Sequence, residues 1–302
     1  MICCLLWGSA FAGVKTGYRL FDIKPSDWQS QMVFAGIRFF IAGIMALITG
    51  SAAERKLLLP AKSSLPKICI ICLFQTVLQY FFYYIGLAHT TGVKAAVIVA
   101  ANVFTAMLIA SLIFRTEKLT ARKLAGCAIG FSGIILINLN GLGGQRPDLF
   151  GDGFIFLCAV SSGVSSALMK KLSRDEDPVL LSGWQFVLGG ALMWGFGAVC
   201  GGSLGRLTLS SGAVLLYLAF VSAAAYSIWS LLLKYHPVSR VSVFGLMNPV
   251  CGVIISAAVL GEGEDFGITG ICALLLVCAG IYAVNSAKDG VDRHKGNDVG
   301  KV

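Results

Sequence analysis

The chain of 302 residues is 57% hydrophobic and only 13% charged, with a formal net charge of +9. A soluble domain carries roughly a quarter of charged residues, so this composition excludes a soluble globular protein. The basic residues lie in the breaks between apolar runs and form no single basic and aromatic patch. This pattern argues against a nucleic-acid partner and indicates a lipid bilayer as the surroundings.

Apolar runs separated by charged or Gly/Pro breaks predict about ten membrane-spanning helices. A helix of about 20 residues crosses a hydrocarbon core of about 30 Å. The expected spans are 1–18, 31–50, 66–88, 93–114, 123–140, 151–170, 179–202, 211–235, 240–261 and 267–286. The first run starts without a charged leader and continues into further spans, so we expect a span there and not a cleaved signal peptide.

Lysine and arginine collect in alternate connections, which predicts the orientation of the chain. The basic connections hold Arg55, Lys56, Lys62, Lys67, Arg115, Lys118, Arg122, Lys123, Lys170, Lys171, Arg174, Lys234, Arg240 and four residues of the polar tail 287–302. The alternate connections hold only Arg19, Lys24, Arg146 and Arg206. We therefore expect a multi-pass protein of the cell (cytoplasmic) membrane with both termini in the cytoplasm.

The two halves of the chain repeat one pattern. The phrase Ala35-Gly-Ile-Arg-Phe-Phe-Ile-Ala-Gly43 aligns with Ser182-Gly-Trp-Gln-Phe-Val-Leu-Gly-Gly190. Five spans are expected in each half, 1–140 and 151–286. Because five is an odd number, the second half would cross the membrane in the opposite sense to the first. Inverted repeats are the architecture of many secondary transporters, whose substrate site lies near the midplane where the halves meet.

Polar and aromatic side chains recur at helical spacing inside two of the expected spans. Gln75, Gln79 and Tyr83 are four residues apart in the third span, and Tyr226 and Trp229 lie in the eighth. Two amides one turn apart need many hydrogen-bond partners, so we expect a polar and aromatic cavity between helices. The alternative is helix packing, in which such side chains bond across an interface without touching a substrate.

Asn102 and Asn248 hold corresponding positions in the fourth and ninth spans, and Pro249 follows the second of them. Each asparagine is expected roughly 12–15 Å deep, at about 1.5 Å per residue. Proline removes a backbone donor and exposes a carbonyl one turn back, and broken helices at mid-depth present such groups to the ligands of transporters. We expect both asparagines to contact the cavity; the alternative is a kink that improves packing.

The charges inside the spans are basic. All 15 acids lie in or beside connections, so no mid-membrane carboxylate is expected to exchange a proton for a cation. Lys15, Arg38 and Lys94 lie within apolar spans. The two lysines can snorkel to the interface, whereas Arg38, about 10 Å from its helix start, needs a carbonyl partner or a solvated cavity. We expect Arg38 and Lys94 to guide anionic or zwitterionic solutes.

The residues that enzymes use are not gathered anywhere in the sequence. The 10 cysteines fall inside apolar segments, and the Cys69-x-x-Cys72 pair lacks a second pair or histidine ligands. The histidines His89, His236 and His294 lie at loops or in the tail. We therefore expect no metal, no cofactor, no catalytic residues and no enzymatic step.

Glycines mark a packing face in the fifth expected span. Gly126 and Gly130 are four residues apart, and such small-residue faces let another backbone approach closely. Because the fifth and tenth spans are otherwise poor in polar groups, we expect a scaffold or a dimer face there, which allows a homodimer.

Several phrases, through their order and duplication, resemble the EamA family of the drug/metabolite transporter superfamily. They are Trp7-Gly-Ser-x-Phe11, Arg38-Phe-Phe-x-Ala-Gly43, Tyr84-Ile-Gly-Leu-Ala88, Glu117-Lys-Leu-Thr-x-x-Lys-x-x-Gly126 and Tyr226-Ser-x-Trp229. The resemblance implies an all-α membrane protein of ten helices in two inverted five-helix repeats, with a central cavity. It also implies outward transport of small metabolites by alternating access. The glycine spacing of the second hairpin departs from that of the first, so the packing face of the fifth span is not carried over to the tenth.

These observations predict a secondary transporter, an exporter of a small polar or amphipathic metabolite such as an amino acid. The expected substrate contacts are Gln75, Gln79, Tyr83, Lys94, Asn102, Tyr226, Trp229, Asn248 and Arg38. The alternative is a multidrug exporter of amphipathic compounds, because an aromatic cavity accepts many apolar ligands.

Overall fold

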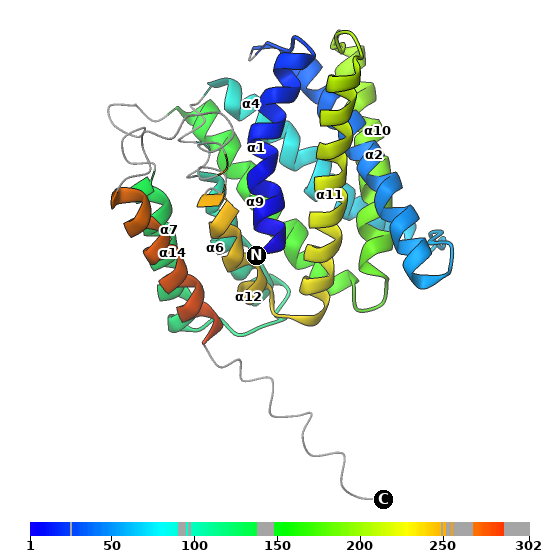
Figure 1. Cartoon of the computed structure of the whole chain (residues 1–302). Helices are drawn as coiled ribbons and strands as arrows, with labels where there is room; N and C mark the ends of the chain where they lie inside the picture. Colours follow the sequence, from blue (N-terminus) through cyan, green and yellow to red (C-terminus); the bar gives the residue numbers. More distant parts are fainter. Residues whose placement is uncertain are drawn as a thin grey trace, which may run out of the picture.

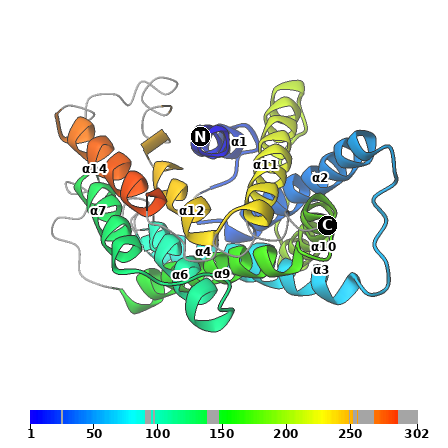
Figure 2. The same ribbon diagram turned by 90° about the horizontal axis from the view of Figure 1, so that it is seen from below.

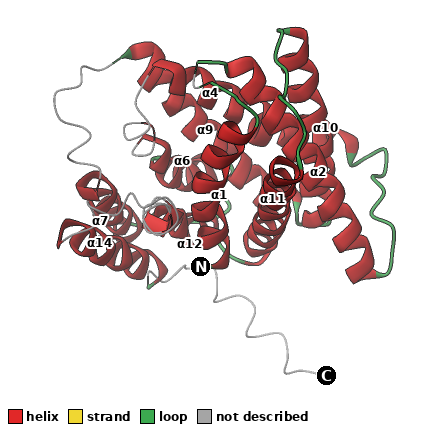
Figure 3. Cartoon of the chain, turned by 45° about the horizontal axis from the view of Figure 1, so that its top comes forward, coloured by secondary structure: helices red, strands yellow, loops and turns green. Residues whose placement is uncertain are grey.

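The structure is a computed structural model, and it describes residues 1–24, 26–89, 95, 98–137, 148–248, 250–251, 255 and 268–286. All regular structure in these ranges is helical, with no strand among them (Figure 3). Five of the described helices are long and apolar enough to cross a membrane by length and composition. This architecture agrees with the all-α membrane protein that the sequence predicts.

Helix occurs in every one of the expected spans. The elements are α1 (Ile2–Leu20), α2 (Trp28–Glu54), α3 (Leu65–Cys72), η1 (Leu73–Leu78), α4 (Gln79–His89), α6 (Asn102–Leu108), η2 (Ile109–Ile113), α7 (Ala121–Ile137), α9 (Leu149–Leu172), α10 (Pro178–Val199), α11 (Leu209–Tyr235), α12 (Val238–Ser242), η3 (Val243–Leu246) and α14 (Ile268–Asn285).

Side-chain caps fix the starts of helices α2 and α10. The Asp27 carboxylate accepts a hydrogen bond from the Ser30 amide at 3.0 Å, and Asp177 accepts one from Leu180 at 2.7 Å. Each cap satisfies a backbone donor that has no partner inside the helix. The two aspartates start α2 and α10, which contain the two aligned phrases of the sequence.

Helices α2 and α10 pack tightly against each other (Figures 1 and 2). A Cβ atom on Gly36 would lie 2.4 Å from the Trp194 nitrogen, and one on Gly43 would lie 2.6 Å from the Gly183 carbonyl oxygen. Early residues of α2 therefore meet late residues of α10, so the helices run antiparallel. Only glycine fits at this distance, because any side chain would overlap the facing backbone.

Helices α7 and α14 form a second antiparallel pair, at the left of Figure 1. A Cβ atom on Gly126 would lie 2.9 Å from the Val284 nitrogen, and one on Gly280 would lie 2.6 Å from the Gly130 nitrogen. The glycine face predicted as a scaffold or dimer face is thus covered within the chain. Its partner is Gly280 of the tenth expected span. The packing face was not predicted for that span from the sequence.

The remaining helices pack between these two pairs. Helix α1 lies along α11, α4 lies along α9, and α6 contacts both α9 and α12 (Figure 2). The start of α1 and the end of α14 lie at the same end of the molecule as the basic connections after α2, η2, α9 and α11 (Figure 1). We refer to this end as the basic end.

Within the described residues, two of the expected spans contain a turn of π-helix. The third expected span passes through η1 and the fourth ends in η2. The hydroxyl of Ser161 in α9 donates a hydrogen bond of 2.7 Å to the Phe74 carbonyl oxygen in η1. A π turn holds one residue more than an α-helical turn. The residues after it therefore face a different direction from the one expected of a continuous α-helix.

Candidate functional site

Four aromatic rings meet where α2 and α4 touch α10 and α11, and we refer to Phe39, Tyr80, Phe186 and Tyr226 as the seam. The Phe39 and Phe186 rings are stacked with centroids 5.1 Å apart and planes within 6°. The Tyr80 and Tyr226 hydroxyls are 3.3 Å apart. Phe39 contacts Tyr80 at 4.6 Å and Phe186 contacts Tyr226 at 4.9 Å, so the four rings form a closed group.

Indole rings extend the seam on one side. Trp7 of α1 contacts the Tyr226 ring at 5.1 Å and the Trp229 ring at 5.0 Å, both edge to face. Tyr226 and Trp229, predicted from their spacing, are therefore brought together with Trp7. Such rings present large apolar faces together with a few polar atoms.

Arg38 brings a buried cation to the seam. Its side chain is 8% exposed, and its Nε and Nη2 atoms donate hydrogen bonds of 3.0 and 2.8 Å to the Ser222 hydroxyl oxygen in α11. Its guanidinium carbon lies 5.1 Å from the Phe39 ring centroid. The partner is a neutral hydroxyl, where the sequence suggested a carbonyl or a solvated cavity. No acid pairs with Arg38 within the described residues.

A related contact involves Gln185, the residue that precedes Phe186 in α10. The Thr76 hydroxyl donates a hydrogen bond of 2.6 Å to the Gln185 side-chain oxygen. Gln185 aligns with Arg38 in the repeated phrase, so one half-chain has an amide where the other has a cation. The Gln185 nitrogen and the Gln75 side-chain oxygen are buried and make no hydrogen bond within the described part of the chain. Buried polar atoms without partners are uncommon in proteins and need an explanation.

The two asparagines lie on helices that pack together. Asn102 is the first residue of α6 and is half-buried, and its neighbour Val103 belongs to the same apolar cluster as Met247. The Asn248 side-chain oxygen is buried without a hydrogen-bond partner among the described residues. Pro249 lies outside the described residues, so the predicted break in the ninth span stays a prediction.

The other predicted contacts lie at varying distances from the seam. Tyr83 is half-buried and packs against the cluster that contains Phe39 and Phe186. Gln79, the first residue of α4, is half-buried. Lys94 lies outside the described residues.

Tyr80, Phe39 and Phe186 are contacts that the sequence reasoning did not select. The four-residue spacing of a straight helix selected Gln79. Helix η1 ends immediately before Gln79, and its wider turn changes which residues share a face, so Tyr80 contacts the seam instead. Phe39 and Phe186 occupy one position of the aligned phrases. The phenylalanine that both phrases share at this position is the sequence feature that could have identified the pair.

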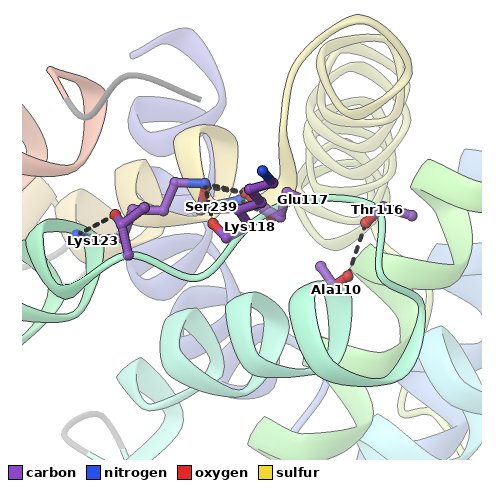
Figure 4. A network of polar contacts seen from close by, with 7 residues as sticks. Ala110, Thr116, Glu117, Lys118, Lys123 and Ser239 are labelled. Atoms are coloured by element: carbon purple, nitrogen blue, oxygen red, sulfur yellow. Dashed lines mark hydrogen bonds and ion pairs between the residues drawn. The ribbon is translucent and has the colours of Figure 1, made fainter. Parts of the chain in front are cut away.

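A second polar cluster lies at the basic end (Figure 4). The Lys123 ammonium, at the start of α7, contacts the Glu117 carboxylate at 2.7 Å, and Lys123 has no exposed surface. The same carboxylate accepts a hydrogen bond of 2.9 Å from the Ser239 amide of α12, and the Ser239 hydroxyl contacts its other oxygen. Glu117 thus joins the hairpin between η2 and α7 to the first turn of α12.

Known proteins share the sequence pattern and the fold of this chain. The family model of the EamA-like transporter family matches residues 1–139 and 149–286. An uncharacterized transporter of Archaeoglobus fulgidus is 26% identical over 92% of this chain and 94% of its own length.

Two bacterial relatives carry a more specific name. Proteins of Salmonella typhimurium and Escherichia coli, each named "probable amino-acid metabolite efflux pump", are 25% and 26% identical over 93% of this chain and 92% of their own lengths.

The fold has a solved counterpart as well. A crystal structure described only as that of a protein superposes with a TM-score of 0.77 over 93% of each chain, at 18% identity. The family model covers nearly the whole sequence, and the apolar helices suit a bilayer. The chain therefore belongs to the EamA-like transporter family and is a multi-pass membrane transporter, not an enzyme.

Proposed function

We propose that the protein exports a small polar or amphipathic metabolite that carries a carboxylate, such as an amino acid. The substrate binds at the seam, and two inverted five-helix halves expose it alternately to the two sides of the membrane. The observation that carries the proposal is Arg38, a buried cation at the seam whose partner is a neutral hydroxyl.

The helix pairs support the inverted repeat. Corresponding helices of the halves, α2 with α10 and α7 with α14, are in direct antiparallel contact. The family model also matches once in each half, over 1–139 and 149–286, close to the expected halves 1–140 and 151–286. Two copies inserted in opposite senses give this arrangement, which is common among secondary transporters.

The seam suits alternating access because it joins the halves at corresponding residues. Phe39 aligns with Phe186, and these two rings stack on each other. When one half rocks against the other, contacts along this line open on one side and close on the other. The paired hydroxyls of Tyr80 and Tyr226 lie on the same line.

The chemistry around the seam favours an amphipathic substrate with a negative group. Guanidinium groups bind carboxylates with two parallel hydrogen bonds, and Arg38 already presents its Nε and Nη2 atoms to one oxygen, that of Ser222. The aromatic rings supply apolar surface. The Gln75 side-chain oxygen and the Gln185 side-chain nitrogen, which make no hydrogen bond within the described residues, supply polar groups. The names of the Salmonella and Escherichia relatives agree with an amino-acid-like substrate.

The arrangement of basic connections supports a cell-membrane protein with both termini in the cytoplasm. Lysine and arginine favour cytoplasmic loops, and the basic connections gather at one end together with the start of α1 and the end of α14 (Figure 1). Labelling of single cysteines tests this orientation. Lys62→Cys should react only after permeabilisation, and Arg206→Cys should react in intact cells.

An export assay tests the substrate class. In cells that overproduce the protein, Arg38→Gln should slow export of amino acids at least tenfold, because the carboxylate loses its cation. Arg206→Gln, which changes an exposed arginine in the connection between α10 and α11, is the control with the same charge change. The double variant Arg38→Gln with Gln185→Arg returns a cation to the corresponding position and should restore part of the flux. Equal export by wild type and Arg38→Gln would refute the proposed role.

A multidrug exporter is the second candidate, and the aromatic seam is the observation that favours it. Apolar amphipaths bind aromatic cavities without precise polar contacts. If the substrate is an apolar drug, Asn102→Ala and Gln75→Ala should leave drug resistance unchanged. If the substrate is a polar metabolite, the same variants should lose its flux. Measuring both substrates with the same variants separates the two functions.

A further inference from the structure

A groove of about 550 Å³ lies at the basic end, between the last turns of α2, the connection that follows it and Trp184 of α10. It is separate from the seam, and neither the seam residues nor Arg38 line it. Its walls include Leu47 and Ile48, and Arg55 and Lys56 stand among its lining residues.

Specific contacts hold the connection that forms the outer wall. The Leu58 amide donates a hydrogen bond of 3.0 Å to the Ser51 hydroxyl, and the Trp184 indole donates one of 2.8 Å to the Leu58 carbonyl oxygen. The Leu58 side chain is buried and would touch a Cβ atom on Gly50 at 2.7 Å. The groove is therefore a built feature of the fold and does not depend on a loose loop.

The groove combines exposed apolar surface with unpaired cations. Ile48 is 63% exposed, Leu57 73% and Leu59 67%. Arg55 and Lys56 are exposed and make no ion pair with any described residue, and the adjacent Glu54 does not line the groove. An apolar channel capped by positive charge complements a molecule with an acyl chain and an anionic head.

A second groove at the same end provides an internal comparison. It has a volume of about 540 Å³ and is also lined by two lysines, Lys67 and Lys171. Lys67 is bonded to Glu176 at 2.8 Å, and the Lys171 ammonium lies 5.2 Å from the Phe114 ring centroid. The cations of this groove are already engaged, which distinguishes it from the groove at Arg55.

We propose that the groove at Arg55 and Lys56 binds one anionic phospholipid. Its phosphate contacts Arg55 and Lys56, and one acyl chain lies along Leu47 and Ile48. Anionic lipids are concentrated in the cytoplasmic leaflet, where they attract juxtamembrane basic residues. The positive-inside rule places this end in that leaflet. The lipid would hold the end of α2 against α10.

Native mass spectrometry of the full chain in detergent measures this binding directly. The protein is titrated with phosphatidylglycerol and, separately, with phosphatidylcholine of the same acyl chains. We expect one phosphatidylglycerol to bind at least tenfold more tightly than phosphatidylcholine. Arg55→Gln with Lys56→Gln should weaken phosphatidylglycerol binding about 25-fold, because each cation near the surface contributes about fivefold.

Two further variants make the result decisive. Arg115→Gln with Lys118→Gln removes two exposed cations from another basic connection and should leave binding unchanged. Ala52→Trp fills the groove, keeps both cations and should also weaken binding; thermal unfolding of each variant confirms that it is folded. Equal affinity for the two lipids, an equal loss in the Arg115 and Lys118 variant, or normal binding by Ala52→Trp would each overturn the proposal. Export is not measured here, so the outcome does not depend on the transported substrate.

Discussion

Two buried cations of this protein, Lys123 and Arg38, have hydrogen-bond partners of different charge. Lys123 lies beside the Glu117 carboxylate at 2.7 Å, and that carboxylate is also bonded to Ser239. Arg38 is nearly as buried, yet its hydrogen-bond partner is the uncharged Ser222 hydroxyl. Both sites join elements from the two halves of the chain.

The difference separates a structural charge from one that is available to a ligand. A cation with its own carboxylate is compensated, and removing the carboxylate leaves a buried charge unpaired. A cation whose partner is a hydroxyl keeps most of its field, because a hydroxyl supplies only a dipole. We therefore expect Lys123 to act in folding and Arg38 to act on the solute. Four predictions test this distinction.

Glu117→Gln should have the largest effect. It leaves the fully buried Lys123 ammonium without its counter-charge, and breaking a buried ion pair costs about 3–5 kcal/mol. Thermal or denaturant unfolding in detergent measures the loss. The double variant Glu117→Gln with Lys123→Met should be more stable than Glu117→Gln alone; if the two were equally destabilised, the pair would not be coupled.

Ser239→Ala should have a smaller effect at the same cluster. It removes the hydroxyl that contacts the carboxylate, but the backbone amide still donates its hydrogen bond of 2.9 Å. A hydrogen bond to a charged group contributes about 1.5–3 kcal/mol, so we expect a loss near the lower end of this range. Ser222→Ala is the matched change beside the seam. It removes the hydroxyl that accepts both hydrogen bonds from the Arg38 guanidinium, so we expect a loss in the same range of about 1.5–3 kcal/mol in the same unfolding assay.

Arg38→Gln should change stability by about 1 kcal/mol or less, in either direction. The variant loses two hydrogen bonds but also removes a desolvated charge that has no acidic partner among the described residues, and these two terms oppose each other. The unfolding midpoint should stay close to that of wild type while export falls. A loss of stability as large as that of Glu117→Gln would make Arg38 a structural residue and erase the distinction.

The partly exposed pair of Lys67 and Glu176 should have the smallest effect. The hydrogen bond from Lys67 holds the pKa of the Glu176 carboxyl below its ordinary value of 4.5. The pair therefore stabilises the fold above that ordinary value, and its contribution is lost as the pH falls through the lowered pKa. The contribution should be about 0.5 kcal/mol because both groups are partly exposed. The difference in unfolding free energy between wild type and Glu176→Gln should shrink as the pH is lowered.

The sequence by itself determined the class, the location of the helices and the family. Long apolar runs must form helices in lipid, because each backbone group needs a partner within its own segment. Caps such as Asp27 and Asp177 are local too. Tyr226 and Trp229 could be selected because their spacing on one straight helix puts them on one face, and Arg38 because a cation inside an apolar run is conspicuous.

Only the tertiary structure decided which faces meet. The partner of Gly126 and Gly130 is Gly280, more than a hundred residues away, and no local pattern specifies that pairing. The π turn η1 depends on packing against α9, and it brings Tyr80 to the seam where straight-helix spacing selected Gln79. Glu117 lies in a connection, and its burial depends on Ser239 from the other half. Contacts between distant segments depend on how the helices pack, and this packing is not encoded by any one stretch of sequence.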